Sequence, residues 1–590
     1  MTGDLARTVL HRHRFARIWG LGDRKAPAAR TPCLVAMPQD LEISPNIAPF
    51  LAVKSDDLPA ELTLEARLPL SPPNFDELSP NYSVNLGHVL PPSLEEANAG
   101  ERQGTSALLP VSWQRMNHDP ELMDTNLRPE IVVLTDAVQL AGQPKKLVDA
   151  LIVLKQRFPG ALLWAPGLAG PDNIGVLAWM GVDLFDTGRS HEACAAGALL
   201  TMQGPRFPLT HESSEMESQH GHWRLALDEL HAAIEQNSLR TLAERQSLSS
   251  PRLVEHLRYH DAVCANLKGL LTSHVHQTRS FPSYSSTSFL DPLVIDWERF
   301  MIEDYEAPEP VRDVMILLPC SARKPYRLSK SHGRFLRAIG GTACHEVMMT
   351  SPLGLVPRDL EDVWPASHYD VPVTGDWTME ELARVKRMLI EHVAKQGYQR
   401  IINHTDMDLS FLKVDVVDTR KGRSAGDHDA LGELTQAVKD AVATFELRHQ
   451  KNSNRLKQHY MSIARKQHRN DAWLNEIKVR GKLPRWRLEA NGEQIAVWSI
   501  DRNGFSFSRA SIDLLGQHRS LPMISLHDDV VWKGDVFSHL VKSYDADIRQ
   551  GDDLLVMQGE QVLGLARASA PAWEWNGTPG SLAKSHQRRK

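Results

Sequence analysis

The chain has 590 residues, of which 42% are hydrophobic and 24% are charged, and its formal net charge is -6. This length is too great for one hydrophobic core, so we expect roughly three to four domains. No apolar run approaches the roughly 18 residues of a membrane span, and the first residues lack the apolar region of a signal peptide, so we expect a cytoplasmic protein with no membrane partner.

Cysteine usage and charge distribution narrow the class further. The five cysteines are odd in number and scattered, which is typical of free thiols in a reducing compartment. Basic residues are concentrated between Lys451 and Arg487, where only Asp471 and Glu476 oppose them. A mildly acidic chain with a basic C-terminal third indicates a polyanionic partner on that side.

The N-terminal half changes character near residue 130. Residues 1–105 alternate short apolar runs with Pro- and Asn-rich turns, which predicts β-rich structure with long loops. Beyond them the pattern predicts alternating strands and helices, namely strands at 131–134, 161–164 and 182–186 and helices at 145–158 and 174–180. This alternation predicts parallel βαβ units, in an open sheet or closed into a barrel.

Two groups of histidines have spacings that can hold a metal. His211, His220 and His222 lie in a polar stretch, and His256 and His260 lie one helical turn apart. No cysteine supports the first group, and the second falls on an amphipathic helix, where histidines commonly pack. We expect no metal at either place.

A second α/β unit begins near residue 291, and its first strand leads into a reactive segment. The apolar run 314–318 predicts a buried strand that Pro319 ends. Because ligands bind at the carboxyl ends of strands in open α/β sheets, the next segment is either an active-site loop or a basic, hydroxyl-rich surface loop. It carries a thiol, an amine, an imidazole and four hydroxyls, in Cys320, Ser321, Lys324, Tyr326, Ser329, Ser331 and His332.

The rest of this unit and the C-terminal region complete the pattern. A strand at 399–402 ends in Asn403 and His404, which we expect to face the same crevice. Residues from 484 to 516 predict a small β-rich or α+β module. The last block has short strands separated by Gly-Asp and Gly-Glu turns, which predicts a compact barrel, either RNA-binding or a structural cap.

Several motifs resemble archaeosine synthases, archaeal paralogues of tRNA-guanine transglycosylase that modify a deazaguanine already present in tRNA. Residues 319–332, PCSARKPYRLSKSH, are similar to the signature loop of that family, and 351–377, SPLGLVPRDLEDVWPASHYDVPVTGDW, continue the match. Residues 165–187 resemble the transglycosylase-like barrel, and the segment 533–568 is similar to a PUA domain.

The resemblance implies an α/β multidomain protein with a TIM-like (β/α) barrel resembling tRNA-guanine transglycosylase, a middle α/β domain, a small α+β domain and a C-terminal PUA β-barrel. The expected boundaries are 1–285 for the barrel, 286–448 for the catalytic α/β domain, 449–518 for the small basic domain, 519–580 for the PUA RNA-binding domain and 581–590 for a basic tail.

The barrel departs from transglycosylases in two ways. The Cys-x-Cys-x-x-Cys cluster that binds zinc there is missing here, so we expect no zinc and no other cofactor. Asp136 follows the strand at 131–134, but no base-exchange site is recognisable around it. We expect the barrel to be silent in base exchange and to act as a binding platform.

The resemblance implies that the substrate is tRNA bearing 7-cyano-7-deazaguanine in the D-loop, whose nitrile is converted toward the amidine of archaeosine. Free lysine is the implied amine donor, with glutamine or ammonia as the alternative, and a radical SAM partner protein would then cleave the lysine adduct. A non-catalytic tRNA-binding paralogue and a base-exchanging transglycosylase are the competing classes. The oligomeric state stays open, a homodimer included.

A nitrile carbon needs a nucleophile, and its nitrogen needs a proton source. In one route the Cys320 thiolate, favoured by Lys324 or Arg323, adds to the nitrile, and an amine then displaces the thioimidate. In the other route the donor amine attacks directly and Cys320 only packs. The expected catalytic residues are Cys320, Lys324, Tyr326, Ser329 and His332.

Two further sets of residues are expected to bind substrate. Residues 352–357 are rigid and apolar, suited to walling a base that has left the helical stack. The expected substrate-binding residues are Ser321, Arg323, Ser331, Ser351, Gly354, Asn403 and His404, and the expected tRNA-binding residues are Arg465, Lys466, Arg469, Lys533 and Arg549.

Overall fold

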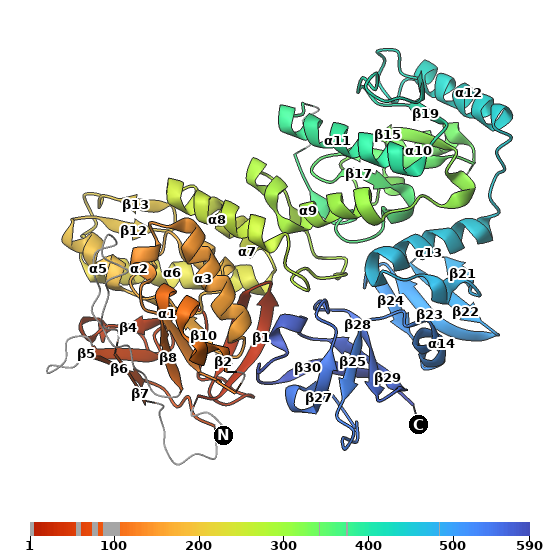
Figure 1. Ribbon diagram of the computed structural model, residues 1–590. Helices are drawn as coiled ribbons and strands as arrows, with labels where there is room; N and C mark the ends of the chain where they lie inside the picture. The colour runs from red at the N-terminus through yellow and green to blue at the C-terminus, as the bar shows by residue number, and fades with distance from the viewer. Residues whose placement is uncertain are drawn as a thin grey trace. The chain divides into compact units, whose positions relative to one another are not determined.

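The computed structural model describes residues 5–54, 61–72, 81–85, 107–124, 126–341, 343–372, 376–482 and 484–589. The chain divides into two compact units (Figure 1). Unit 1 comprises residues 1–270, 536–539 and 570–582, and unit 2 comprises residues 271–535, 540–569 and 583–590. Among the helices of the described ranges, none is both long and apolar enough to cross a membrane.

An eight-stranded sheet with the order β7-β6-β5-β4-β11-β10-β9-β8 forms the centre of unit 1. The pairs β8–β9, β9–β10, β10–β11, β11–β4 and β4–β5 are parallel, which confirms the expected βαβ pattern, whereas β5–β6 and β6–β7 are antiparallel. The strands are β4 (Cys33–Ala36), β5 (Phe50–Lys54), β6 (Glu61–Ala66), β7 (Asn81–Asn85), β8 (Leu108–Val111), β9 (Ile131–Leu134), β10 (Leu162–Trp164) and β11 (Leu184–Asp186).

The order of these strands bears on the expected barrel. Neighbours in the sheet are neighbours in the chain, and the last strand, β11, pairs with the first, β4. That cyclic order suits a barrel, but the hydrogen-bonded ladder of the described residues ends at β7 and β8, and two of its pairs are antiparallel. The sheet is therefore part of a mixed α/β architecture, and a TIM-like barrel stays a prediction.

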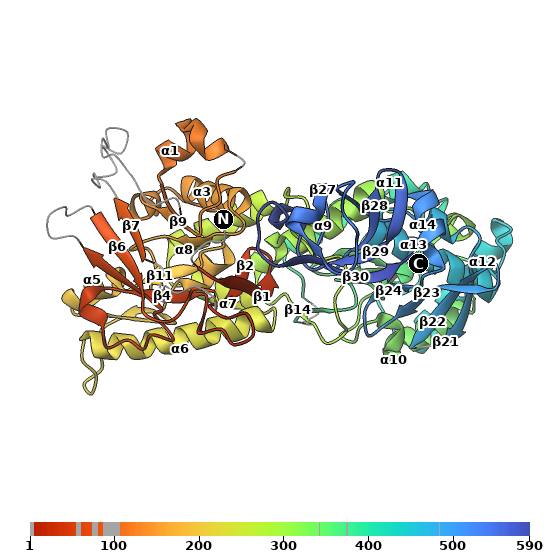
Figure 2. The ribbon, with the colours of Figure 1, turned by 90° about the horizontal axis from the view of Figure 1, so that it is seen from below.

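Helices and two smaller sheets complete unit 1. Helix α3 begins with a proline and buries Leu147, Val148, Leu151 and Leu154, one stripe at helical spacing. Figure 2 shows the long helix α6 beside α7, outside the strands. The elements are β1 (Arg7–His13), β2 (Ala16–Leu21), β3 (Ala29–Arg30), α1 (Trp113–His118), α2 (Ala137–Leu140), α3 (Pro144–Arg157), α4 (Ile174–Trp179), α5 (Gly188–Ala195), β12 (Leu199–Thr201), β13 (Gly204–Arg206), α6 (Met216–Glu235), α7 (Leu239–Ser247), α8 (Pro251–Cys264) and β26 (Val536–Phe537).

The first part of unit 2 is a five-stranded sheet with the order β17-β16-β15-β19-β20. Its pairs are parallel except β16–β17, and the central strand β15 is buried from Val314 to Leu318, as its continuous apolar run predicts. The elements are α9 (Pro292–Arg299), β15 (Val314–Pro319), α10 (Lys330–Ile339), β16 (His345–Thr350), β17 (Gly354–Pro357), α11 (Met379–Gln396), β19 (Arg400–Asn403), β20 (Asp415–Asp418) and α12 (His428–Thr444), with the small pair β14 (Phe281–Pro282) and β18 (Tyr369–Asp370).

An antiparallel sheet with the order β21-β22-β23-β24 follows, and helix α13 lies along one of its faces (Figure 1). Tyr460 of α13 contacts the rings of Trp486, Trp498 and Phe505, which fixes the helix on the sheet. The elements are α13 (Asn452–His468), β21 (Lys478–Lys482), β22 (Arg485–Ala490), β23 (Glu493–Ser499), β24 (Gly504–Phe507) and α14 (Ser511–His518).

Within unit 2, the last sheet has the strand order β30-β29-β28-β25-β27. Residues 581–588, expected as part of a basic tail, instead form β30, because Ala583 to Arg588 pair with β29. The other expected domain boundaries stay predictions. The strands are β25 (Met523–Leu526), β27 (Val541–Tyr544), β28 (Asp553–Gln558), β29 (Gln561–Ala568) and β30 (Ser581–Arg588).

Candidate functional site

Three parallel strands of unit 2 end at one edge, and the reactive segment starts there. Strand β15 leads into Cys320, β16 ends at Thr350, and β19 ends at Asn403. The register pairs Pro319 with Met349, so the next residues, Cys320 and Thr350, are neighbours. A hydrogen bond from the Thr350 hydroxyl reaches the Cys320 sulfur. The carboxyl edge of the sheet is thus the place where the predicted segment meets two other strand ends.

Cys320 is half-buried, and its surroundings act in opposite directions on the thiol. Burial raises the pKa of Cys320, while the Thr350 hydrogen bond and the Lys324 charge lower it. Burial dominates, so the pKa of Cys320 is above its ordinary value. Lys324 favours the thiolate, as the sequence predicts, but the thiol form prevails in the protein as it stands.

Lys324 and two tyrosines, Tyr326 and Tyr369, lie on the same side of the segment as this thiol and contact one another. The Lys324 Nζ lies 3.9 Å from the centroid of the Tyr369 ring, a cation–π contact, and burial lowers the pKa of Lys324. The Tyr326 and Tyr369 hydroxyls are hydrogen-bonded, and the Tyr369 hydroxyl lies 2.5 Å from the Thr350 Oγ1. A continuous chain of hydroxyls therefore runs from Tyr326 to the hydrogen-bond partner of Cys320.

Sequence reasoning missed Thr350 and Tyr369, the two middle members of this chain. Both are buried, and burial raises the pKa of Tyr369. Tyr369 lies within the second family-like motif, at 351–377, so the motif contained a signal for it. Thr350 just precedes that motif, and only the pairing of β15 with β16 places it next to Cys320.

His332 is buried and held neutral. Its Nδ1 lies 3.1 Å from Nη2 of Arg358, and its ring lies 5.2 Å from that of Tyr326. Burial and the Arg358 charge lower the pKa of His332 to about 3. At neutral pH this imidazole accepts a hydrogen bond from Arg358 rather than serving as a cationic acid.

The serines of the segment have local partners. The Ser329 hydroxyl accepts a hydrogen bond from the backbone N–H of His332 at 3.2 Å, so it caps α10, and it lies 3.1 Å from the Ser331 hydroxyl. The Ser321 hydroxyl donates to the Arg323 carbonyl at 3.1 Å, and the Arg323 side chain is exposed. Ser329 thus shapes the segment, while Arg323 points to solvent.

Ser351 and Gly354 connect the segment after β16 to α11. The Ser351 hydroxyl donates to Glu381 at the start of α11. Gly354 has a φ of +74°, and a Cβ at this position would lie 2.1 Å from the Met388 sulfur. The positive φ favours glycine there, and the close Met388 side chain shows that β17 packs against α11.

Asn403 has its side-chain polar groups engaged within its own loop, and His404 has both ring nitrogens engaged by the segment that follows β20. The Asn403 amide donates to the Met407 carbonyl at 2.9 Å and accepts from the Thr405 backbone and hydroxyl at 3.0 and 2.7 Å. The His404 nitrogens lie 2.7 Å from the Thr419 hydroxyl and 2.8 Å from the Ala425 carbonyl. Both residues lie at the expected strand end, where they fix the loop that carries the exposed Asp406.

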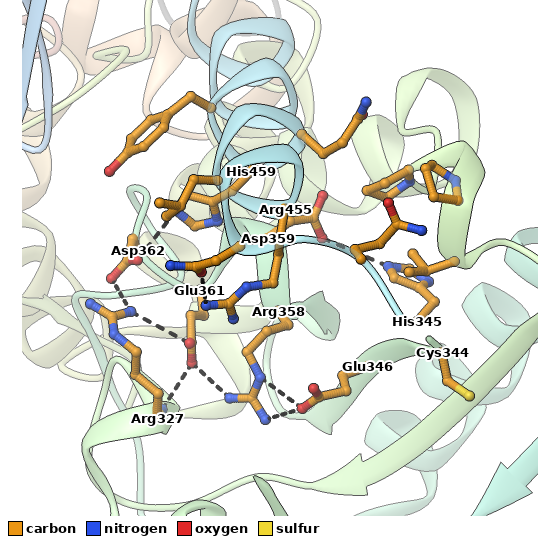
Figure 3. A pocket seen from close by; sticks show the side chains of 18 of the residues that line it. Arg327, Cys344, His345, Glu346, Arg358, Asp359, Glu361, Asp362, Arg455 and His459 are labelled. Carbon is orange, nitrogen blue, oxygen red and sulfur yellow. Dashed lines mark hydrogen bonds and ion pairs between the residues drawn. The ribbon is translucent and has the colours of Figure 1, made fainter. Parts of the chain in front are cut away.

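A cavity of about 290 Å³ lies next to this region, between the start of β16, the 3-10 turn η8 (Arg358–Leu360) and α13. Arg327, Arg358, Glu346 and Glu361 point toward one another in it, and Arg455 and His459 reach it from α13 (Figure 3). Arg358 lies 2.7 Å from Glu346 and 3.0 Å from Glu361, and Arg327 lies 2.5 Å from Asp362. Sequence reasoning missed this cavity, which is the second candidate site.

Arg327 and Arg358 are paired with carboxylates of this cavity. Glu346 and Glu361 raise the pKa of Arg358 against the effect of its burial. Tyr326 faces the thiol side and the next residue, Arg327, faces the cavity, so the ion pairs of Arg327 fix the backbone that carries Tyr326. The cavity network therefore positions the reactive segment.

The expected tRNA-binding residues fall into two groups. Lys466 is largely buried, 3.0 Å from Asp296 and beside the Phe300 ring, and Arg549 is largely buried and 3.2 Å from Asp552. Arg465 pairs with Asp471 at 3.2 Å. Arg469 keeps 66% of its side chain exposed while pairing with Asp547, and Lys533 is exposed. Arg469 and Lys533 are thus the two with open side chains.

The two histidine groups, for which the sequence predicts no metal, have protein partners in the structure. Within the described ranges no three His, Cys, Asp or Glu side chains form a group that could hold a metal ion. His220 lies 3.4 Å from Asp40, and His260 lies 3.4 Å from the Cys264 sulfur. The expectation that no zinc or other cofactor is needed stays a prediction.

Comparison with known proteins places this geometry in context. The model of a domain of unknown function, DUF5591, matches residues 294–438, which contain the reactive segment. Archaeosine synthase subunit alpha of Methanosarcina acetivorans is 27% identical over 92% of this chain and 93% of its own length. Archaeosine synthase of Methanocaldococcus jannaschii is 26% identical over 75% of this chain and 77% of its own length. The resemblance to archaeosine synthases is confirmed.

A third relative and one solved structure complete the comparison. Archaeosine synthase subunit alpha of Thermoplasma acidophilum is 25% identical over 77% of this chain and 86% of its own length. The crystal structure of AF0587, a protein of unknown function, is 20% identical and covers 50% of this chain and 98% of its own, with a TM-score of 0.39. The similarity to archaeosine synthases thus extends well beyond the domain matched at 294–438.

Proposed function

We propose that this protein modifies tRNA by converting the nitrile of 7-cyano-7-deazaguanine in the D-loop toward the amidine of archaeosine. The observation that carries the proposal is the similarity to archaeosine synthase subunit alpha over 92% of the chain. The thiol, amine and hydroxyl chain at the carboxyl edge of β15 and β16 supply the groups that this conversion requires.

We propose Cys320 as the nucleophile. Its sulfur forms a bond to the nitrile carbon, and the thiol proton goes to the nitrile nitrogen, which gives a thioimidate. The donor amine then adds to the same carbon, and the carbon–sulfur bond breaks as the sulfur regains a proton, which leaves the amidine. Because burial raises the pKa of Cys320, loss of its proton is coupled to the addition rather than preceding it. The rival route is direct attack by the donor amine.

The neighbouring groups take the protons and hold the base in this scheme. Thr350, Tyr369 and Tyr326 form the hydroxyl chain that carries a proton to or from the sulfur. Lys324, with its pKa lowered by burial, loses a proton more readily than an ordinary lysine does. Ser321 and Arg323 lie on the solvent side of the segment, where a base that has left its stack would enter.

The remaining assignments of the proposal concern partners. Lysine is the favoured amine donor, with a radical SAM partner protein acting on the adduct, and the reaction takes place in the cytoplasm. The eight-stranded sheet of unit 1 serves as a transglycosylase-like binding platform. The last sheet of the chain, β25–β30, serves as a PUA-type RNA-binding domain. Arg469 and Lys533 contribute phosphate contacts from their exposed positions.

One paired assay tests the proposal. Nitrile-bearing tRNA is incubated with labelled lysine and, separately, ordinary tRNA is incubated with labelled free deazaguanine base. Label from lysine alone supports the proposal, whereas label from the base identifies a base-exchanging transglycosylase. Binding of tRNA with no label in either reaction identifies a non-catalytic tRNA-binding protein, and labelled glutamine or ammonia in place of lysine identifies the donor.

A further inference from the structure

The hairpin of β21 and β22 carries cations on one face. Its register places Lys478 opposite Glu489, Arg480 opposite Arg487, and Lys482 opposite Arg485. Residues directly opposite each other share a face of the sheet, so the two cationic pairs lie side by side. The outer hairpin face is defined here as Lys478, Arg480, Lys482, Arg485 and Arg487, which are all exposed.

The opposite face of the hairpin is turned toward α13. Leu488 is buried, and the half-buried Trp486 lies with its ring 6.5 Å from that of Tyr460 in α13. Gly481 opposes Trp486 with a φ of +116°, and a Cβ there would lie 2.9 Å from the Arg485 carbonyl oxygen. Because side chains alternate along a strand, this packing directs the outer hairpin face to solvent.

The outer hairpin face has little internal charge compensation. Of its five cations, Arg480 alone has an ion pair within the part of the chain that the structure describes, with Glu489 at 3.4 Å. The next strand, β23, places Val497 opposite Arg487 and Ser499 opposite Arg485, so it adds no carboxylate on that side. Like charges directly opposite each other destabilise a strand pair. The arrangement therefore costs stability until an anion lies on it.

We propose that the outer hairpin face binds the phosphate backbone of RNA. Three of its five cations are arginines, whose guanidinium groups donate two parallel hydrogen bonds to a phosphate. Side chains on one face recur every ~6.8 Å along a strand, and the neighbouring strand lies ~4.8 Å away, so the cations form a ladder about 14 Å long. A ladder of cations on a rigid ribbon complements a continuous polyanion, and it supplies contacts that do not depend on base sequence.

The choice of tRNA as the RNA rests on the proposed function, but the surface is testable without the chemistry. The full-length chain is titrated with an unmodified tRNA transcript, with an unrelated RNA duplex and with phosphatidylserine vesicles, across roughly 50 to 200 mM salt. The double variant R485Q/R487Q is compared with the control K439Q/R509Q, which removes two exposed cations from α12 and from the turn before α14.

We expect R485Q/R487Q to weaken binding of both RNAs and to lower the slope of log Kd against log salt by about 1.4 to 1.8, or ~0.7 to 0.9 for each cation. The control variant should keep the wild-type slope. The melting temperature of free R485Q/R487Q should equal or exceed that of the wild type, because the substitutions remove like-charge contacts. Folding of the variant is thereby checked in the same experiment.

Three outcomes would overturn the inference: a wild-type protein that binds neither RNA, equal slopes for R485Q/R487Q and its control, or a loss of vesicle binding with RNA binding unchanged. The proposed function is scored separately, by labelled lysine incorporated at saturating tRNA. If that label fails to enter while the slope depends on Arg485 and Arg487, the proposed chemistry fails and the RNA surface stands.

Discussion

The carboxyl edge of β15 and β16, called the reactive edge here, and the neighbouring cavity both contain buried ionisable side chains, but these side chains differ in charge state. At the edge, Cys320, Lys324 and Tyr326 are buried or half-buried. Burial raises the pKa of Cys320 and Tyr326 and lowers the pKa of Lys324, so it favours the neutral form of each. In the cavity, Arg358 stays charged because Glu346 and Glu361 lie within 3.0 Å of it. Polar groups that lack a full counter-charge are available for proton transfer, whereas fully paired ions hold a shape. This difference supports the proposal that the reaction takes place at the edge, while the paired ions of the cavity position the reactive segment.

Removing the cavity cation should give the largest effect, and the effect should be on stability. Arg358→Leu leaves Glu346 and Glu361 without their shared partner, and we expect the free energy of unfolding to fall by about 3 to 5 kcal/mol. Denaturant unfolding measures this. Arg387→Leu is the control, because its pair with Glu298 is more exposed and should contribute about 0 to 1 kcal/mol. Equal losses in the two variants would contradict the positioning role.

Removing the thiol tests the reactive edge directly. We expect Cys320→Ala to lower lysine incorporation into nitrile-bearing tRNA by at least about 100-fold, because the covalent route is lost while its proton donors remain. Unfolding by denaturant should change far less than in Arg358→Leu. Cys344→Ala is the matched control, since this thiol lies in the cavity with its pKa raised to about 12 by burial. Incorporation by Cys320→Ala at a near wild-type rate would favour direct attack by the donor amine.

The hydroxyl chain offers a finer comparison. Tyr326→Phe removes the terminal hydroxyl and should lower kcat by roughly 10- to 100-fold with KM little changed, because proton transfer rather than binding is affected. Tyr398→Phe serves as the control, since its buried hydroxyl is hydrogen-bonded to His345 and His392 and is not a member of the hydroxyl chain. A loss of activity that is the same in both variants would show that any buried hydroxyl in this unit matters only for folding.

The smallest expected effect concerns pH. The folded His332 has a pKa of about 3 against an ordinary value of 6.5, so its contribution to stability is complete above pH 6.5 and is lost as the pH falls toward 3. The slope is at most about 1.4 kcal/mol per pH unit for this one group. We expect His332→Asn to flatten the dependence of unfolding free energy between pH 6.5 and 5 relative to the wild type. An unchanged dependence would mean that His332 is not held neutral.

Local patterns sufficed for the strands and for the place of the reactive segment. The apolar run 314–318, the proline that ends it and the second strand at 400–403 gave the carboxyl edge, because strand periodicity and parallel order are readable from short windows. The confirmed parallel strands of unit 1 at 131–186 follow from the same signal.

The partners of individual side chains were beyond sequence reasoning. Lys466 pairs with Asp296, 170 positions away, and Arg327 pairs with Asp362, 35 positions away. Neither ion pair produces a periodic pattern in the sequence. A buried, paired basic residue therefore cannot be distinguished from an exposed one by sequence alone. Thr350 entered the site in the same way, through the register between two strands.

The burial of β15 on both faces has a kinetic consequence for the segment that follows it. Residues 314–318 are central in their sheet and fully buried, so their amide hydrogens should exchange with solvent only when the whole unit opens. Residues 321–324 are half-buried or exposed, and their amides should exchange through small local openings. Cys320 stands where the two regimes meet. Its backbone is thus held by one of the slowest-opening parts of the unit, while the residues that would admit a substrate can move on a far shorter timescale.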